Sequence, residues 1–401
     1  MRKLVLALSV ALLACFSALA AEDPRAPKPL DYMAELRKAE VDAGKTPEGS
    51  RFNGALGMLA TQQSFVGDTE RAIETFERAR FRDAPELLPE EEARQFVADH
   101  EVRDALQAIL AQTRGRQIVM INEAHHVPRD RAFATLVALE LRKRGFEYLA
   151  METLSGDMEA MTARGYSLED NGYYNRDPVY GDFIRRALAA GYTPVAYETD
   201  YPAGLEGEAF DDYREGKQAQ NIVDRVLAKD PKARILVHVG YGHLRTGVVD
   251  ADNGKTWTVM AERLKTKTGI EPFSIDQTQS LPANESVLAA VFAKAPGRSF
   301  VLEARDAEYP YSESPSVDMY VYHQPTRVVK GRADWLSMDG YRGPRAIPAK
   351  LLPKSGRRLI QAFVPGESAD AIPIDQVLVT AGEPPPVLML PKGKYRFAFQ
   401  D

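Results

Sequence analysis

The sequence is poor in cysteine and lacks long runs of basic or apolar residues. Cys15 is its single cysteine among 401 residues, which excludes a disulfide framework and any multi-cysteine zinc or iron–sulfur site. The 51 basic and 57 acidic residues form no Lys/Arg block, so a nucleic-acid binder is not expected. After the first twenty residues no stretch is long and apolar enough for a transmembrane helix. With 44% hydrophobic and 27% charged residues, the composition indicates a globular protein of two or three domains.

The N-terminus has the pattern of an exported protein. Basic residues at 1–3 precede an apolar run at 4–16 and an Ala18-Leu19-Ala20 cleavage site. We therefore expect a signal peptide at 1–20, cleaved after Ala20, and a periplasmic or secreted mature protein. In the alternative, Leu12-Leu13-Ala14-Cys15 is a lipobox and Cys15 carries a lipid anchor. The cleavage site matches the signal-peptide pattern better.

The next part of the chain is expected to be helical. Residues 21–50 are rich in Pro, Ala and charge and predict a linker with a short helix at 32–41. Apolar spacing predicts a helical region at 51–114, with a hairpin over 52–80 and one helix over 90–112. Residues 67–79 resemble half of a tetratricopeptide repeat. Because a solenoid needs about three repeats, one hairpin packed on the main domain is favoured over a peptide-binding array.

Residues 115–279 predict an α/β domain with a mostly parallel sheet flanked by helices. Apolar β-type runs alternate there with amphipathic helices. The expected strands are 118–122, 148–152, 193–199 and 234–240, and a last pair at 257–266 and 272–276 closes the layer. Helices are expected at 129–144, ending at Gly145, and at 211–228.

Residues 280–401 predict a small β-sandwich. Short β-type runs alternate there with turns rich in Pro and Gly. Residues 388–397 have the pattern of a final hairpin. No residue of this part indicates chemistry, and His323 is expected to be structural.

Polar residues gather where the predicted strands end. Ligands of open parallel sheets bind beyond the carboxyl ends of the strands, and four of the six histidines lie at the ends of two strands. The expected catalytic residues are Glu123, His125, His126, Glu152 and His243. The expected substrate-binding residues are Glu198, Arg214 and Tyr241.

Several of these residues also have an ordinary structural interpretation. His238 lies in the middle of a strand and is expected to be a core histidine. Glu198 could face solvent, and Arg214 could pair with Asp211 or Asp212 on its own helix. Of the tandem histidines, one is expected in the site and one in the structure. The aromatic loop at 172–180 is as consistent with a pocket lid as with a surface loop.

The spacing of the strand-end histidines and carboxylates is compatible with three kinds of chemistry. A histidine held by a carboxylate can act as a general base. Histidines and carboxylates can hold a divalent metal, and histidine or tyrosine can bind haem iron. The sequence contains no Gly-x-Ser-x-Gly elbow and no His-Glu-x-x-His motif, which disfavours serine-hydrolase and ordinary zincin chemistry.

Four short elements within residues 116–276 resemble one superfamily. It joins the ChaN haem-binding lipoproteins, the erythromycin-esterase-like hydrolases, and the TraB and Tiki proteins. The matching elements, in order, are Asn122-Glu123-Ala124-His125-His126, Phe146 to Glu152, Arg214-Glu215-Gly216-Lys217-Gln218-Ala219-Gln220-Asn221, and Val239-Gly240-Tyr241-Gly242-His243. Asn122, Glu215 and Gln218 stand where relatives usually have Gly, Asp and Met.

The resemblance implies different activities for different relatives. Esterase-like relatives imply His125 or His126 as the base, oriented by Glu123 and Glu152. Tiki-like relatives imply metal-dependent peptide hydrolysis, and ChaN-like relatives imply haem or iron binding without turnover. We expect an exported hydrolase of a small-molecule or peptide ester or amide, and metal assistance, as in the Tiki-like relatives, is an open alternative. A haem-binding protein and a non-catalytic scaffold are the other hypotheses.

Overall fold

The computed structural model of the protein describes residues 29–45, 54–79, 87–250, 256–281, 283–304, 310–312 and 314–401. The predicted signal peptide, its cleavage after Ala20 and the alternative anchor at Cys15 lie outside these residues. Every helix within the described ranges is too short or too polar to traverse a lipid bilayer.

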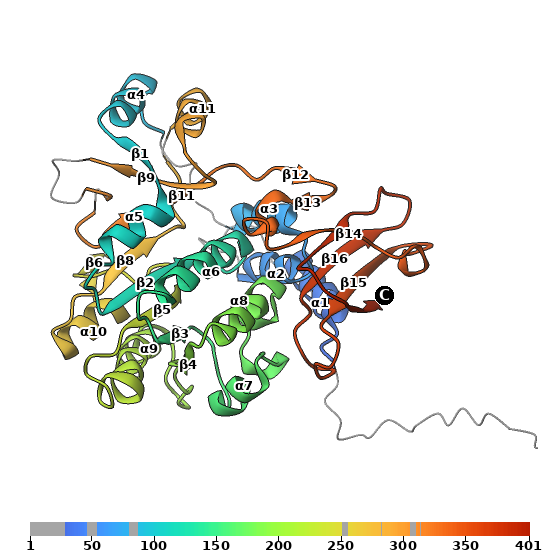
Figure 1. Cartoon of the computed structure of the whole chain (residues 1–401), viewed down its shortest axis with the longest axis horizontal. Helices are drawn as coiled ribbons and strands as arrows, with labels where there is room; N and C mark the ends of the chain where they lie inside the picture. Colours follow the sequence, from blue (N-terminus) through green and yellow to red (C-terminus); the bar gives the residue numbers. More distant parts are fainter. Residues whose placement is uncertain are drawn as a thin grey trace, which may run out of the picture.

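A parallel sheet forms the centre of the molecule (Figure 1). Its strands are β2 (Ile118–Glu123), β3 (Tyr148–Met151), β4 (Thr193–Ala196), β5 (Ile235–Gly240), β8 (Phe273–Asp276) and β10 (Met319–Tyr320). Within the described residues their order is β10-β8-β2-β5-β3-β4, and all neighbouring pairs are parallel. β2 and β5 are buried along their whole length because helices cover both faces. The predicted α/β fold is confirmed.

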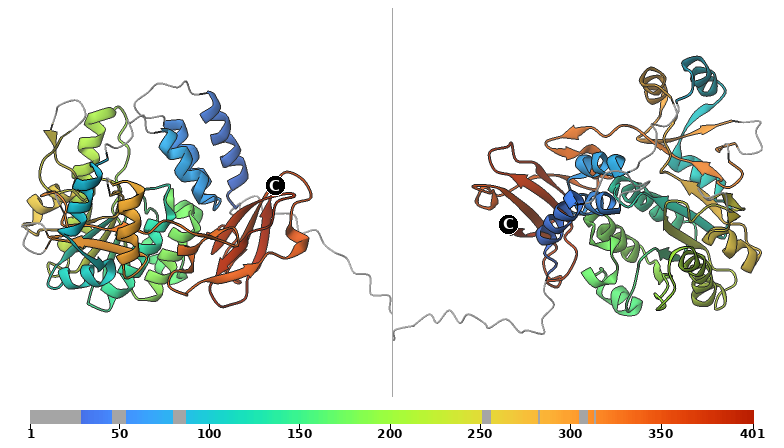
Figure 2. Two further views of the ribbon diagram at one scale, coloured as in Figure 1. Left: turned by 90° about the horizontal axis from the view of Figure 1, so that it is seen from above. Right: turned by 180° about the vertical axis from the view of Figure 1, so that it is seen from behind.

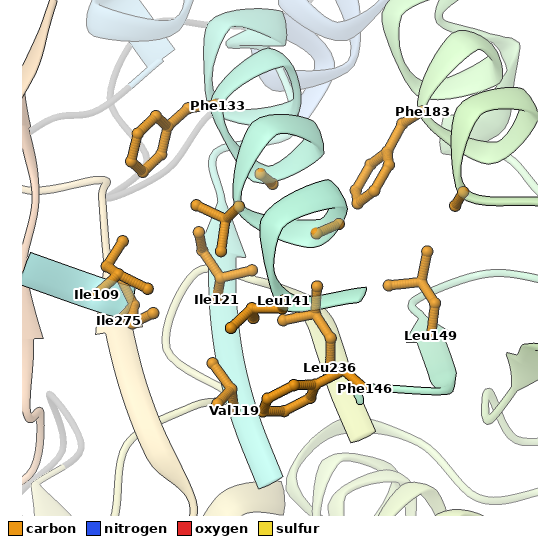
Figure 3. Close-up of a cluster of buried hydrophobic side chains, with 14 of the residues drawn as sticks. Ile109, Val119, Ile121, Phe133, Leu141, Phe146, Leu149, Phe183, Leu236 and Ile275 are labelled. Atoms are coloured by element: carbon orange, nitrogen blue, oxygen red, sulfur yellow. The ribbon is translucent and has the colours of Figure 1, made fainter. Parts of the chain in front are cut away.

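Side chains alternate between the two faces of the sheet. Val119 and Ile121 of β2 join one core and Ile118 and Met120 the other, as the strand period of two requires. The helices over the first face are α5 (Ala105–Gln112), α6 (Pro128–Arg142) and α8 (Pro178–Ala189), and α9 (Gly207–Ile222) and α10 (Met260–Thr268) cover the second. Figure 3 shows how α6 and α8 pack on the first face. α7 (Met158–Arg164) lies near β4.

Two predictions for this core were wrong. The segment predicted as one helix at 90–112 is α4 (Glu90–Ala98), β1 (Glu101–Asp104) and α5. The carboxylate of Asp104 accepts a hydrogen bond from the Gln107 N–H, which caps a new helix there. The predicted strand at 257–266 is largely α10, whose spaced apolar residues face the sheet and which ends at left-handed Gly269.

The front helices pack between the core and the C-terminal sheets (Figure 2). They are α1 (Tyr32–Lys45), α2 (Gly54–Phe65) and α3 (Thr69–Ala79). The predicted hairpin is present as α2 and α3. Its turn approaches the C-terminal sheet so closely that a Cβ on Gly67, where φ is +79°, would lie 2.5 Å from the Gln376 carbonyl oxygen. Beside it, Leu378 donates a backbone hydrogen bond to Val66 over 3.1 Å.

The C-terminal part contains small antiparallel sheets. β15 (Arg357–Phe363) lies between β16 (Asp375–Thr380) and β18 (Arg396–Gln400), β14 (Gly343–Ala346) pairs with β17 (Val387–Leu390), and β12 (Val328–Val329) pairs with β13 (Arg332–Ala333). The predicted hairpin at 388–397 is wrong, because β17 and β18 each pair with a different strand. Gln400 reaches back to α1, since its side chain accepts from the Met33 N–H and donates to the Leu30 carbonyl.

Residues 283–323 contribute to the core rather than to these sheets. β10 extends the parallel sheet beside β8. β9 (Ser299–Glu303) pairs with β1 and with β11 (Tyr322–His323) in an antiparallel sheet, and α11 (Glu285–Lys294) contacts α4. A short hairpin of β6 (Val249–Asp250) and β7 (Thr256–Trp257) follows β5.

Candidate active site

The strand ends bring one histidine and one glutamate together. Glu123 is the last residue of β2, and its Oε1 lies 2.9 Å from Nδ1 of His125. Because an ionised carboxylate only accepts hydrogen bonds, this contact assigns the proton of neutral His125 to Nδ1. Nε2 of His125 then carries the lone pair. We call Glu123 and His125 the first dyad.

A buried arginine fixes the first dyad. Arg131 of α6 is fully buried and donates to both carboxylate oxygens of Glu123, over 2.6 and 2.7 Å. It also donates to the His125 carbonyl over 2.9 Å, and its Nη1 lies 3.5 Å from Asp177. Burial by itself raises the pKa of Glu123, but the charge and hydrogen bonds of Arg131 outweigh it and leave this pKa well below its ordinary value. Glu123 is therefore ionised at neutral pH.

Neighbours on several sides surround the His125 ring, among them Tyr241, whose ring lies edge-on with centroids 4.9 Å apart. Tyr174 stacks on it with ring centroids 3.7 Å apart. On the β5 side, a Cβ on Gly240 would lie 2.3 Å from Cε1 and 2.6 Å from Nε2 of His125, and 2.9 Å from Oε2 of Glu152. Only glycine therefore fits at the end of β5. Nε2 of His125 and the Glu152 carboxylate both lie against this residue.

A second histidine and glutamate lie opposite. Nδ1 of His243 is 2.6 Å from Oε1 of Glu215, and Oε2 of Glu215 accepts from the Met260 N–H over 2.6 Å. Arg214 Nη1 lies 3.2 Å from Nε2 of His243, and because a guanidinium has no acceptor, Nε2 is the acceptor. Burial lowers the pKa of His243, but the hydrogen bond with Glu215 and the charges of Glu152 and Glu215 outweigh burial and raise it. Glu215 and His243 form the second dyad.

Arg214 joins the second dyad to two further carboxylates. It donates to Glu152 over 2.7 Å and to Glu198 over 2.7 and 3.1 Å. Glu198 also accepts from Gln218 over 2.9 Å, and Glu152 accepts from the Gly240 N–H. Burial raises the pKa of Glu152, but the charges of His243, His125 and Arg214 outweigh it and lower the pKa to about 2. The guanidinium thus lies between two carboxylates and a histidine nitrogen.

The structure separates the tandem histidines. His125 belongs to the first dyad, whereas buried His126 stacks on Phe76 of α3 with ring centroids 3.6 Å apart. The Tyr241 hydroxyl lies 3.5 Å from Nδ1 of His126. Tyr241 has a left-handed backbone, with φ +43°, that turns the chain from β5 toward His243. His126 and Tyr241 therefore form the rim under the front helices, beside the dyads rather than within them.

The other predicted site residues converge as follows. A continuous chain of contacts at the ends of β2, β3, β4 and β5 and on α9 joins Glu123, His125, Glu152, Glu198, Arg214 and His243. The alternative that Arg214 pairs along its own helix is wrong, because its partners lie in the segments that follow β3, β4 and β5. His238 lies buried beneath the first dyad, with Nε2 3.5 Å from Glu123. Tyr174 of the aromatic loop lies over the site, as a lid residue would.

Three contributors were missed from the sequence. Arg131 lies on the apolar stripe of α6 with Ala134 and Ala138, three and seven residues further along, and a charged residue at such a position is a signal. Glu215 was noted only as a departure from the relatives, although Glu215 and Gln218 are polar on the buried side of α9. Phe76 gave no signal, because only the tertiary packing of α3 brings it to His126.

The donor set fits neither a metal nor a haem as it stands. Within the described ranges, no group of three or more His, Cys, Asp or Glu side chains could hold a metal ion. The carboxylates are already bound by Arg131 and Arg214, and a cation would have to displace a guanidinium. Haem iron would have to displace Arg214 from Nε2 of His243, and Nε2 of His125 faces Gly240 and Glu152 inside the site.

Comparison with known proteins gives only distant matches. No protein-family model and no curated protein matches the chain. Two solved structures of bacterial protein toxins, 17% and 14% identical, each match 57% of this chain and 46% of their own with a TM-score of 0.34. RRSP, a MARTX toxin effector domain from Vibrio vulnificus CMCP6, is 14% identical over 70% of this chain and 50% of its own, with a TM-score of 0.31. The chain thus spans about half the length of the structures it matches, and likeness at this level carries no information about activity.

Proposed function

We propose that the protein is a hydrolase of ester or amide bonds that uses His125 as its general base. The observation that carries this proposal is the first dyad, in which Glu123, ionised by Arg131, lies 2.9 Å from Nδ1 of His125. A carboxylate in this position fixes the tautomer whose Nε2 accepts a proton. The resemblance to esterase-like relatives supports the same assignment.

The two dyads have different roles in the proposed reaction. Nε2 of His125 takes a proton from water as the water oxygen bonds to the substrate carbonyl carbon. The negative charge that develops on the carbonyl oxygen faces Arg214, a preorganised donor. His125 then returns the proton to the leaving oxygen or nitrogen as its bond to carbon breaks. The second dyad and Glu152 hold Arg214 in place.

The substrate class can be tested with chromogenic esters and peptide anilides. We expect His125→Ala to lower kcat/KM by at least about 100-fold. His100→Ala is the matched control, because His100 lies before β1 with Nδ1 at the Phe96 carbonyl, and it should keep full activity. Full activity of the His125→Ala variant would rule out His125 as the general base.

Metal and haem analysis of the purified protein separates the other hypotheses. A stoichiometric metal that is lost in His125→Ala and His243→Ala would favour the metal-assisted hydrolase of the Tiki-like alternative. A Soret band on haem titration, lost in the same variants, would favour haem binding. A protein with no ligand and no turnover, indifferent to both substitutions, would favour the scaffold.

We further propose that the protein is exported and that cleavage follows Ala20. The pattern at residues 1–20 supports this. Intact-mass analysis of the protein from its native host should give a chain that starts at Ala21. A chain that starts at a lipidated Cys15 would instead show that the protein is anchored by a lipid.

A further inference from the structure

A small cavity lies away from the dyads, between the core and the C-terminal part. It encloses about 70 Å³ beside the first turn of α6, the β9–β11 sheet and the 3-10 turn Asp334–Ser337. Its lining includes Arg129, Phe133, Arg298, His323, Trp335 and Met338. None of these residues belongs to the candidate active site.

Two arginines contribute positive charge to this cavity. Arg298 donates to Asp334 over 2.8 Å, and that carboxylate also accepts from the Arg327 N–H over 3.1 Å. Nε of Arg129 is shielded from solvent and has no hydrogen-bond partner among the described residues. Its nearest carboxylate oxygen among the described residues is Oδ1 of Asp130, which is 4.0 Å away, at the limit of an ion pair. Burial raises the pKa of Asp130 to about 7, so this carboxylate only partly balances the charge of Arg129.

His323 does not neutralise the charge of Arg129. His323 is bound on both sides, with Nδ1 2.8 Å from the Ser299 hydroxyl and Nε2 3.1 Å from the Gln277 side-chain oxygen. Burial, followed by the charges of Arg129 and Arg298, lowers the pKa of His323 well below its ordinary value, so this ring is neutral. Asp339 also lines the cavity.

We propose that this cavity binds a small oxyanion, either a phosphate or a carboxylate group, between Arg129 and Arg298. Guanidinium groups form charge-assisted, fork-shaped hydrogen bonds with both kinds of anion. The volume holds a few waters and is far below the roughly 300–1,000 Å³ of sites for drug-sized molecules. It therefore fits the ion itself or the anionic end of a larger molecule, with Phe133, Trp335 and Met338 as the apolar wall. This proposal does not depend on the hydrolase.

Trp335 provides a direct readout. The chain has two tryptophans, and in a Trp257→Phe background Trp335 is the remaining fluorophore. We would titrate this protein with inorganic phosphate, acetate and phenyl phosphate, with chloride as the ionic-strength control, and confirm each Kd by calorimetry. Arg129→Gln and Arg298→Gln remove one guanidinium each, and Arg345→Gln, whose side chain contacts the Gly393 carbonyl and the Tyr395 ring, is the matched control.

We expect saturable binding of phosphate or acetate that weakens at least about tenfold in each cavity variant, the loss of one charge-assisted contact. Arg345→Gln should bind like the parent, and circular dichroism should show that all variants are folded. Tighter binding of phenyl phosphate than of phosphate would identify the end of a larger molecule as the ligand. No binding of any of the anions at millimolar concentration, or equal binding by parent and cavity variants, would overturn the proposal.

Discussion

Glu215 and His243 are paired in the same way as Glu123 and His125, because a carboxylate oxygen lies within 3 Å of the histidine Nδ1 in both pairs. The two histidines differ in what faces Nε2. Arg214 donates to Nε2 of His243, whereas Nε2 of His125 faces Gly240 and Glu152. A proton acceptor whose lone pair is already bound is a poor base, so the roles of base and positioning residue follow from these contacts.

Glu215→Gln should lower the pKa of His243. The wild-type pKa is raised because the hydrogen bond with Glu215 and nearby carboxylates outweigh burial. A raised folded-state pKa stabilises the protein below the unfolded pKa of about 6.5, and this stabilisation is lost as pH rises through the folded pKa. Titration of His243 by heteronuclear NMR measures the shift. Glu215→Asp keeps the charge and should restore part of the wild-type pKa, and an unchanged pKa in Glu215→Gln would refute the second dyad.

Gly240→Ala should displace His125 and Glu152. The new Cβ would lie 2.3 Å from Cε1 of His125 and 2.9 Å from the Glu152 carboxylate. If the proposed hydrolase is correct, kcat/KM falls about 100-fold, the cost of roughly a 1 Å misplacement. Gly242→Ala is the control, because its Cβ would meet nothing closer than Arg245 at 3.9 Å. Unaltered His125 NMR shifts in Gly240→Ala would count against the close contact.

Arg131→Met should destabilise the protein by about 3–5 kcal/mol, because it leaves the buried Glu123 charge without its partner. Urea unfolding measures the change in free energy. Arg142→Met, on the same helix, removes an arginine that packs over Tyr192 and should cost no more than about 1 kcal/mol. Equal costs would mean that the ion pair with Glu123 is not what makes Arg131 important.

His238 should make the protein less stable in mild acid. Burial lowers its pKa to about 4, so between pH 6.5 and 4 the unfolded state binds the proton more readily and stability falls as pH falls. The loss reaches about 3 kcal/mol at most. His238→Gln should remove this slope in urea unfolding at pH 7.5, 6 and 5. Glu152 affects the stability of the protein only at lower pH, because its pKa is lowered to about 2.

Gly67→Ala should separate the front hairpin from the C-terminal sheet. The methyl group would lie 2.5 Å from the Gln376 carbonyl oxygen. Gly115 has a similar φ, +73°, with nothing within 4 Å of its Cβ position, so Gly115→Ala measures the backbone strain alone, about 1 kcal/mol. Faster amide exchange at Leu378 in Gly67→Ala than in Gly115→Ala is the expected result, and equal rates would refute the contact.

The sheet and the strand-end residues could be predicted because both follow from local patterns. β2 and β5 are continuous apolar runs, and the parallel-sheet rule then places Glu123 and Glu152 at one edge. The second dyad was not predicted, because Glu215 reaches His243 from a helix through a contact that no spacing encodes. The break of the 90–112 helix was missed because the pairing of β1 with β9, about 200 residues away, overrides the helical pattern.

The contact of Gln400 with Leu30 joins residues 370 apart. Contacts at such a separation form slowly, because closing the loop costs chain entropy before the contact repays it. The contacts of α1 and the preceding Leu30 with Gln400 can therefore form only after the last strand has been synthesised, whereas their contacts with Glu169 and Arg176 do not require that strand. Because every strand of the parallel sheet precedes β18 in the chain, we expect this junction between α1 and β18 to close after the sheet that holds both dyads.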